Sequence, residues 1–119
     1  MRIQKFEELI AWQKAQDIAV DVYESFKELK DWSFKDQIGR AAVSISNNIA
    51  EGFDRQSNKE FIRFLYISLG STSEVKSMLY LAKRLDYLNT TDVDKLQAQS
   101  IEVSKIITGL IKSLQSSNY

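Results

Sequence analysis

The chain has no cysteine, no histidine and no proline among its 119 residues, and it has only four glycines. Without cysteine there is no disulfide, no thiolate nucleophile and no cysteine-based zinc site. Without histidine, the Ser-His-Asp triad, the common zinc sites and the Glu-x-x-His iron motif of ferritin-like bundles are excluded. Because a β-rich fold normally uses more turn residues than this, the composition favours helices.

Long apolar runs and an excess of either charge are missing too. The longest uninterrupted apolar run, Met78–Ala82, is far shorter than the roughly 20 residues that span a bilayer. The N-terminal segment "MRIQKFEELIAWQKAQ" carries acidic residues and lacks the apolar stretch of a signal peptide. We therefore expect a cytoplasmic protein with no membrane partner. Lysine plus arginine equals aspartate plus glutamate at 16 each, so the net charge gives no indication of nucleic-acid binding.

What the chain does contain is a regular pattern of apolar residues at spacings of three and four. This pattern predicts four helices, at about 7–29, 34–53, 57–85 and from 90 or 91 onward. Ser33 is the expected N-cap of the second helix, and Ser57 opens the third with the capping box Ser-Asn-Lys-Glu. Short connections make neighbouring helices antiparallel. The sequence therefore predicts an all-α, antiparallel up-and-down four-helix bundle that forms one domain over residues 1–119.

The third predicted helix carries apolar residues around more of its circumference than one bundle buries. Between Phe61 and Leu69, only Arg63 and Ser68 are not apolar. A helix that is apolar all round is buried all round, so we expect this part to pack against another subunit. The alternative is that these are scattered exposed apolar residues, which are normal one at a time. The expected interface residues are Phe61, Ile62, Phe64, Tyr66 and Leu69.

Three segments of the chain resemble a known family: "FEELIAWQKAQDIAVDVY", "DQIGRAAVSISNNIAEGFDRQSNKEFIRFLYISLGSTSEV" and "LDYL". They are similar to the bacterial four-helix bundle protein family, which is also called the 23S rRNA intervening-sequence protein family. The most specific block reads N-I-A-E-G-F-x-R, then S-x-K-E-F-I-R-F-L, then G-S. The resemblance implies an antiparallel four-helix bundle that assembles into a ring, typically a homopentamer.

The same resemblance bears on function. The family includes members encoded inside 23S rRNA genes and the accessory proteins of diversity-generating retroelements, which are basic and bind nucleic acid; for most members no biochemical activity is established. This chain has Gly39 where a basic residue is frequent, leaving only Arg40, and Leu69 where a basic residue often precedes Gly-Ser. Ser46 stands where proline is common. The lost positive charges weaken a nucleic-acid role carried over from the basic members, but they do not weaken the expected fold or assembly.

Polar residues at i, i+4, i+7 and i+11 form a stripe along the second predicted helix, and two more form a stripe on the third, beside Gly70. If the stripes face each other, they make a polar network that fixes the register between helices or subunits. The alternative is an anion or nucleotide site that uses Arg55 and the amides. We favour the structural interpretation, because catalytic machinery is missing. The network residues are Ser44, Asn48, Glu51, Arg55, Ser71 and Glu74.

Three basic residues spaced four apart cross the junction between the second and third predicted helices. Arg55, Lys59 and Arg63, together with Arg40, are the candidate phosphate-binding residues. Repeated around a ring, the first three would form a basic rim for RNA or DNA. The alternative is a solvated face whose charges are balanced by the acidic residues of the same junction.

Two pairs of carboxylates, Asp21-x-x-Glu24 and Glu51-x-x-Asp54, resemble those that hold Mg²⁺ in all-α nucleotide pyrophosphohydrolases. The alternative is that the first pair belongs to a solvated acidic stripe and the second lies at a helix end. We adopt this alternative and predict a protein that is not an enzyme and has no metal or other cofactor.

The function expected from the sequence is that of a non-enzymatic, ring-forming accessory protein that binds RNA or DNA. The rival interpretation is a protein-interaction scaffold, in which the ring displays surfaces to other proteins. A magnesium-dependent, pyrophosphohydrolase-like enzyme is the remote alternative. The expected partners are therefore further copies of the chain, in a pentamer, and RNA or DNA.

Overall fold

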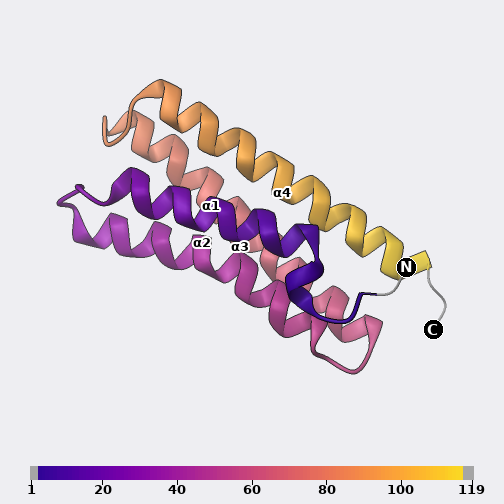
Figure 1. Cartoon of the computed structure of the whole chain (residues 1–119). Helices are drawn as coiled ribbons and strands as arrows, with labels where there is room; N and C mark the ends of the chain where they lie inside the picture. Colours follow the sequence, from indigo (N-terminus) through magenta and orange to yellow (C-terminus); the bar gives the residue numbers. More distant parts are fainter. Residues whose placement is uncertain (1–2, 117–119) are drawn as a thin grey trace.

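The computed structural model describes residues 3–116, which form an antiparallel four-helix bundle (Figure 1). After a short 3₁₀ helix, Phe6–Glu8 (η1), come α1 (Ile10–Phe26), α2 (Trp32–Phe53), α3 (Asn58–Arg84) and α4 (Thr90–Ser116). No strand occurs in this part of the chain. Its extents of 48 × 21 × 20 Å are those of a rod of helices lying side by side. The predicted all-α, antiparallel four-helix bundle is thus confirmed.

Each helix turns one stripe of apolar residues toward a shared core. In α1 the buried residues Ala11, Ala15, Ile18, Val22 and Phe26 are spaced three or four apart, which keeps them on one face. Fully burying a side chain of this kind stabilises the fold by roughly 1.5–3 kcal/mol. The fully buried large side chains from the other helices include Ile38, Ile45, Ile49, Leu65, Leu79, Leu96 and Ile107.

The beginning of the chain differs from the continuous helix that the sequence predicts over about 7–29. Leu9 is extended, with φ −76° and ψ 127°, and it separates η1 from α1. In a continuous helix, Leu9 would point away from the core, because residues two apart, such as Leu9 and the buried Ala11, lie on nearly opposite faces. The break turns Leu9 inward, where it is 8% exposed. At the other end, α1 stops at Phe26 rather than at Leu29.

The N-cap of α2 is Asp31, so the prediction of Ser33 was wrong. One carboxylate oxygen of Asp31 accepts a hydrogen bond from the Phe34 N–H at 3.1 Å, and the other accepts one from the Tyr87 hydroxyl at 2.6 Å. Two carboxylate oxygens allow Asp31 to cap the helix and bind the tyrosine together. The predicted cap of α3 is confirmed, since Ser57 Oγ accepts from the backbone N–H three residues later at 3.2 Å.

The turn after α3 is stopped by a residue in the left-handed region. Asp86 has φ 57°. The Tyr87 N–H donates to Ala82 O at 2.9 Å and the Asp86 N–H donates to Lys83 O at 3.2 Å, which is the bonding of a Schellman motif. The Tyr87 hydroxyl then reaches Asp31, so the α1–α2 and α3–α4 connections are joined at one end of the bundle. None of the helices in the described range is long and apolar enough to cross a membrane.

Candidate interaction surfaces

Side-chain hydrogen bonds join α2 to α3 at the predicted polar stripes. Asn48 Nδ2 donates to Ser44 O and to Ser44 Oγ, both at 2.9 Å, within α2. Ser71 Oγ on α3 donates to the same Ser44 Oγ at 2.9 Å. Three of the six predicted network residues therefore come together. The Asn48 amide group donates its hydrogen bonds within α2, so these donors are not free to bind a ligand.

The other three predicted network residues lie at the surface. Arg55 Nη2 pairs with Glu51 Oε2 at 3.2 Å, one turn apart at the end of α2. Glu74 accepts a hydrogen bond at 3.3 Å from Gln37 Nε2, which the sequence did not single out. Exposed pairs of this kind contribute about 0–1 kcal/mol each. Of these two contacts, only the one between Gln37 and Glu74 joins α2 to α3, so the six predicted residues do not form one continuous network.

Two further polar contacts between helices involve fully buried hydroxyls, and sequence reasoning missed both. Ser68 Oγ on α3 donates to Ile45 O on α2 at 2.8 Å, and Gln16 Nε2 on α1 donates to Ser46 Oγ on α2 at 3.0 Å. Ser46, Ser68 and Thr72 are all 0% exposed. A buried hydroxyl requires a hydrogen-bond partner. The available signal was that Ser68 and Thr72 interrupt an otherwise apolar stripe, but a backbone carbonyl partner leaves no trace in the sequence.

Close packing at Gly52 fixes the approach of α2 to α3. A Cβ at this position would lie 2.6 Å from Phe64 Cβ and 3.1 Å from Phe61 Cδ1. Only glycine allows so close an approach. The neighbouring Phe53 packs edge-on against Phe61, with ring centroids 5.8 Å apart. This glycine and phenylalanine therefore position α2 against α3.

Three of the four candidate phosphate-binding residues are paired with carboxylates. Arg40 Nε lies 2.8 Å from Asp36 Oδ2, and Arg63 Nη2 lies 3.3 Å from Glu60 Oε1. Arg55 pairs with Glu51, as described above. Each pairing removes part of the net positive charge that would attract a phosphate.

Two of these arginines converge on one aromatic ring. The guanidinium carbons of Arg55 and Arg63 lie 4.7 and 4.8 Å from the ring centroid of Phe64, at cation–π distance. Lys59 is exposed in the same turn and forms no ion pair within residues 3–116. The junction of α2 and α3 thus gathers three of the candidate cations. Arg40 lies about four turns away along α2.

The two carboxylate pairs do not form one site. Tyr23 packs against Gly39, and Gln16 bonds to Ser46, so α1 and α2 run antiparallel in a known register. In that register, Asp21 and Glu51 are about ten residues apart along the helix axis, or roughly 15 Å. Among the described residues, no three acidic side chains are grouped closely enough to hold a metal ion.

The predicted interface residues on α3 have three different environments. Phe61 and Phe64 are 7% and 6% exposed, so the bundle itself already buries them. Ile62 and Leu69 are partly buried against the same core. Tyr66 is 54% exposed. Of the five, Tyr66 has the most surface left to offer another chain.

Between Tyr66 and Leu81, Glu74 is the one charged residue among the exposed residues of α3. We define the outer face of α3 as Tyr66, Gly70, Ser73, Ser77 and Tyr80, all of which are exposed. Ile67 and Leu81 lie beside it and are 40% and 45% exposed. Isolated exposed apolar residues are ordinary, but here four large ones lie along a single helix.

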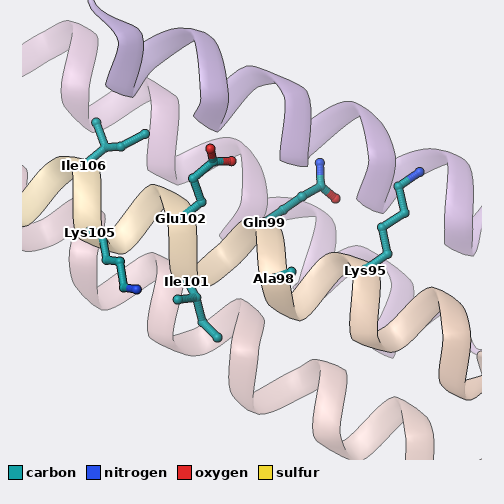
Figure 2. Close-up of a pocket in the computed structure, with 7 residues that line it drawn as sticks. All are labelled: Lys95, Ala98, Gln99, Ile101, Glu102, Lys105 and Ile106. Atoms are coloured by element: carbon teal, nitrogen blue, oxygen red, sulfur yellow. The ribbon is translucent and has the colours of Figure 1, made fainter.

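A shallow hollow on the surface is lined by residues of α4 alone (Figure 2). It encloses about 610 Å³ and is lined by Lys95, Ala98, Gln99, Ile101, Glu102, Lys105 and Ile106. Ligand sites are normally concave clefts with convergent polar groups. Side chains from one helix provide only one wall, so this hollow does not have the form of a ligand site.

Comparison with known proteins decides the family. The model of the 23S rRNA-intervening sequence protein family matches residues 7–109. The chain belongs to this family. A crystal structure of a protein of unknown function from the S23 ribosomal protein family of Bacteroides thetaiotaomicron is similar in fold, with a TM-score of 0.83. The two are 29% identical, and the similarity covers 87% of this chain and 99% of the other. No curated protein matches the chain.

In this member of the 23S rRNA-intervening sequence protein family, the segments that carry the resemblance have clear structural roles. The N-I-A-E-G-F block contains Gly52, which lets α3 approach α2. The L-D-Y-L segment contains Asp86, which stops α3, and Tyr87, which binds the cap of α2. These residues account for the shared fold, so membership of the family does not by itself indicate a ligand.

Proposed function

We propose that the protein is a non-enzymatic module that acts by binding protein surfaces, in the first place those of further copies of itself. The observation that carries the proposal is the outer face of α3, with Tyr66 and Tyr80 exposed by 54% and 60%. Apolar groups gathered along an exposed surface are typical of protein–protein contacts, where tyrosine is enriched. Buried in a contact, two aromatic anchors would carry much of the binding energy.

The charged candidates support binding to protein more than catalysis. The two acidic pairs are about 15 Å apart along the bundle, and three of the candidate cations already have carboxylate partners. Sixteen basic residues are balanced by 16 acidic ones. A ring of five is what the family resemblance implies, and a ring requires a head-to-tail contact that closes on itself.

The test is the mass of the protein in solution, measured by light scattering during size exclusion. The wild-type protein is expected to be larger than one chain at micromolar concentration. The double variant Tyr66→Glu/Tyr80→Glu is expected to have a lower mass than the wild type, because it places charges on the outer face of α3. Ile101→Glu is the matched control on α4, where Ile101 is 43% exposed, and it is expected to leave the mass unchanged. A wild-type mass of one chain contradicts the proposal.

Nucleic-acid binding is the second candidate function, favoured by the convergence of Arg55 and Arg63 on Phe64 beside Lys59, which has no ion pair among residues 3–116. Electrostatic binding must weaken steeply with salt, and each lost contact with a duplex phosphate reduces the salt dependence by about 0.9 in the log–log slope. Fluorescence anisotropy with labelled RNA and DNA would measure this slope. Arg55→Gln/Lys59→Gln/Arg63→Gln should reduce it, whereas Arg40→Gln should not. Absence of binding at low salt removes this candidate and leaves the first.

A further inference from the structure

We infer that the outer face of α3 pairs, antiparallel and two-fold, with the same face of a second copy of the chain. The inference rests on the proposed self-assembly and names both the surface and the partner. Its basis is a seam of exposed residues spaced alternately four and three apart, as in a coiled coil. The seam residues are Lys59, Arg63, Tyr66, Gly70, Ser73, Ser77, Tyr80 and Arg84.

The composition of this seam distinguishes it from an ordinary solvated helix face. From Tyr66 to Tyr80 the seam carries no charge over four turns. The equivalent exposed seam of α4 contains Lys95, Glu102 and Lys105 within a similar length. A face that meets only water has no reason to replace charged side chains with tyrosines and small residues.

The small residues at the centre of the seam are not required by the fold of the single chain. Glycine and serine are poorer helix formers than alanine, lysine or glutamate. A Cβ added at Gly70 would have nothing within 4 Å in the described part of the chain. Space of this kind next to exposed aromatic rings allows a second helix to approach closely.

The seam is complementary to itself when two copies are placed antiparallel about a point midway between Gly70 and Ser73. Tyr66 then lies opposite Ser77 of the partner copy, so a large side chain meets a small one. Gly70 lies opposite Ser73 of the partner copy, which permits close approach of the backbones. Arg63 lies opposite Tyr80 of the partner copy, in position for a cation–π contact.

The charged residues beside the seam select this register. In the pairing described, Glu74 lies next to Ile67 of the partner copy and Lys76 next to Leu69, so their charges can turn outward into water. Moving one copy by a heptad in one direction would bring Glu74 and Lys76 each against its own equivalent. Moving it by a heptad in the other direction would bring Glu74 against Glu60 of the partner copy. Both shifts are repulsive. The remaining like-charge pair, Lys59 with Arg84, falls at the two ends, where solvent screens it.

The area available along one helix suits a weak contact. The 26 residues from Lys59 to Arg84 span about 40 Å at 1.5 Å per residue, and a helix with its side chains is about 10 Å across. This face is therefore roughly 400 Å² per partner, or about 800 Å² in total, which is the size of a weak, transient interface. Because the contact uses the same face on both copies, it closes at two chains and is separate from the head-to-tail contact of a ring. It gives dimers, or pairs of rings where rings also form.

Cysteine cross-linking tests the pairing with no background, because the chain contains no cysteine. Tyr66→Cys and Ser77→Cys are prepared separately, then mixed and oxidised. The pairing predicts at least a fivefold higher yield of disulfide dimer in the mixture than in either variant alone, because 66 faces 77 of the partner copy. Like positions are about 11 residues, or roughly 16 Å, out of register. Ala98→Cys mixed with Lys105→Cys, on α4, is the control and should not cross-link.

Equal cross-linking of the mixture, the single variants and the control overturns the inference. An absence of cross-linking in a sample whose mass exceeds one chain also overturns the two-fold pairing. That result does not contradict the proposed self-assembly. A wild-type mass of one chain overturns both. As a second measurement, Gly70→Trp should lose the two-fold contact, while Gly109→Trp should keep it. Gly109 is the matched control because a Cβ there also meets nothing within 4 Å, but it lies on α4. Retention of the contact by Gly70→Trp contradicts the pairing.

Discussion

Gly52 allows α2 and α3 to pack closely because it has no Cβ. Because a Cβ here would come within 2.6 Å of Phe64 Cβ, Gly52→Ala must push α3 away from α2. Overpacking of this kind costs about 1–3 kcal/mol, and the better helix propensity of alanine offsets at most about 1 kcal/mol. We expect a net loss of about 1–2 kcal/mol in the free energy of unfolding, measured with urea. Gly109→Ala is the control and should be neutral or stabilising; equal stability of both variants would contradict the account.

The hydrogen bond between Tyr87 and Asp31 makes the stability depend on pH. The Tyr87 hydroxyl and the Phe34 N–H hold the pKa of Asp31 below its ordinary value, and the same carboxylate raises the pKa of Tyr87 above its ordinary value. For Asp31, the unfolded chain binds the proton more tightly than the folded chain. Its contribution is therefore fully present above about pH 4 and is lost as the pH falls through the folded pKa. For Tyr87, the contribution is present below about pH 10 and is lost as the pH rises through its folded pKa.

Asp31→Asn tests this pH dependence, because asparagine is also a good N-cap but has no charge. The variant should be less stable than the wild type at neutral pH, and the difference should shrink as the pH falls below about 4. Urea unfolding across that range measures it. Tyr87→Phe should likewise make the stability less dependent on pH in the acid range, because it removes the hydrogen bond that contributes most to lowering the pKa of Asp31. A stability difference that stays constant down to acid pH would refute the assignment.

The caps also show which residues a sequence can identify. Ser57 was predictable because its partner is three residues away and belongs to a local motif. Asp31 was missed although its capping partner, the Phe34 N–H, is also three residues away, because Ser33 offered a competing cap two residues later. Its second partner, Tyr87, is 56 residues away in the chain and has no local signal. Within the polar stripes, the spacing correctly placed Ser44 and Asn48 on one face of α2. Spacing could not indicate that Ser68 bonds to a backbone carbonyl.

At the scale of elements, the end of α3 offers a stabilising substitution. Asp86 holds φ 57°, a conformation that glycine adopts without steric penalty and other L-residues adopt with strain. Asp86→Gly should therefore stabilise the protein by about 0.5–1 kcal/mol, and it should raise the midpoint of thermal unfolding followed by circular dichroism. Asp86→Ala should lower the midpoint, since alanine tolerates this region poorly. A lower midpoint for the glycine variant would show that the aspartate side chain has a role of its own.

The apolar circumference of α3 illustrates the limit of periodicity. The helix packs between α2 and α4 (Figure 1), so the bundle buries two apolar stripes rather than one. Phe61 and Phe64 therefore turn inward, although the sequence suggested that they could face another subunit. Periodicity identifies apolar stripes, but it does not say how many neighbours a helix has. Of the exposed tyrosines left outside, Tyr66 was expected from the sequence as an interface residue, but Tyr80, which lies about four turns further along the helix, was missed.

At the scale of the whole molecule, the four-helix architecture followed from short connections and apolar spacing, because each helix had to bury one face. Assembly and function are harder to predict, since they depend on what the outside of the bundle contacts. Three of the candidate basic residues looked free in the sequence, but in the structure they have carboxylate partners. The outer face of α3, by contrast, contains no charged residue and therefore no ion pair.

Hydroxyl-radical footprinting of tyrosines tests this central claim most directly. In a single chain, Tyr66, Tyr80 and Tyr23 are exposed by 54%, 60% and 56%, so they should be oxidised to similar extents. In the assembled protein, we expect Tyr66 and Tyr80 to be protected, whereas Tyr23 on α1 should remain as reactive as before; dilution or Gly70→Trp should remove the protection. Equal oxidation of the three tyrosines at a concentration where the protein is assembled would contradict the account.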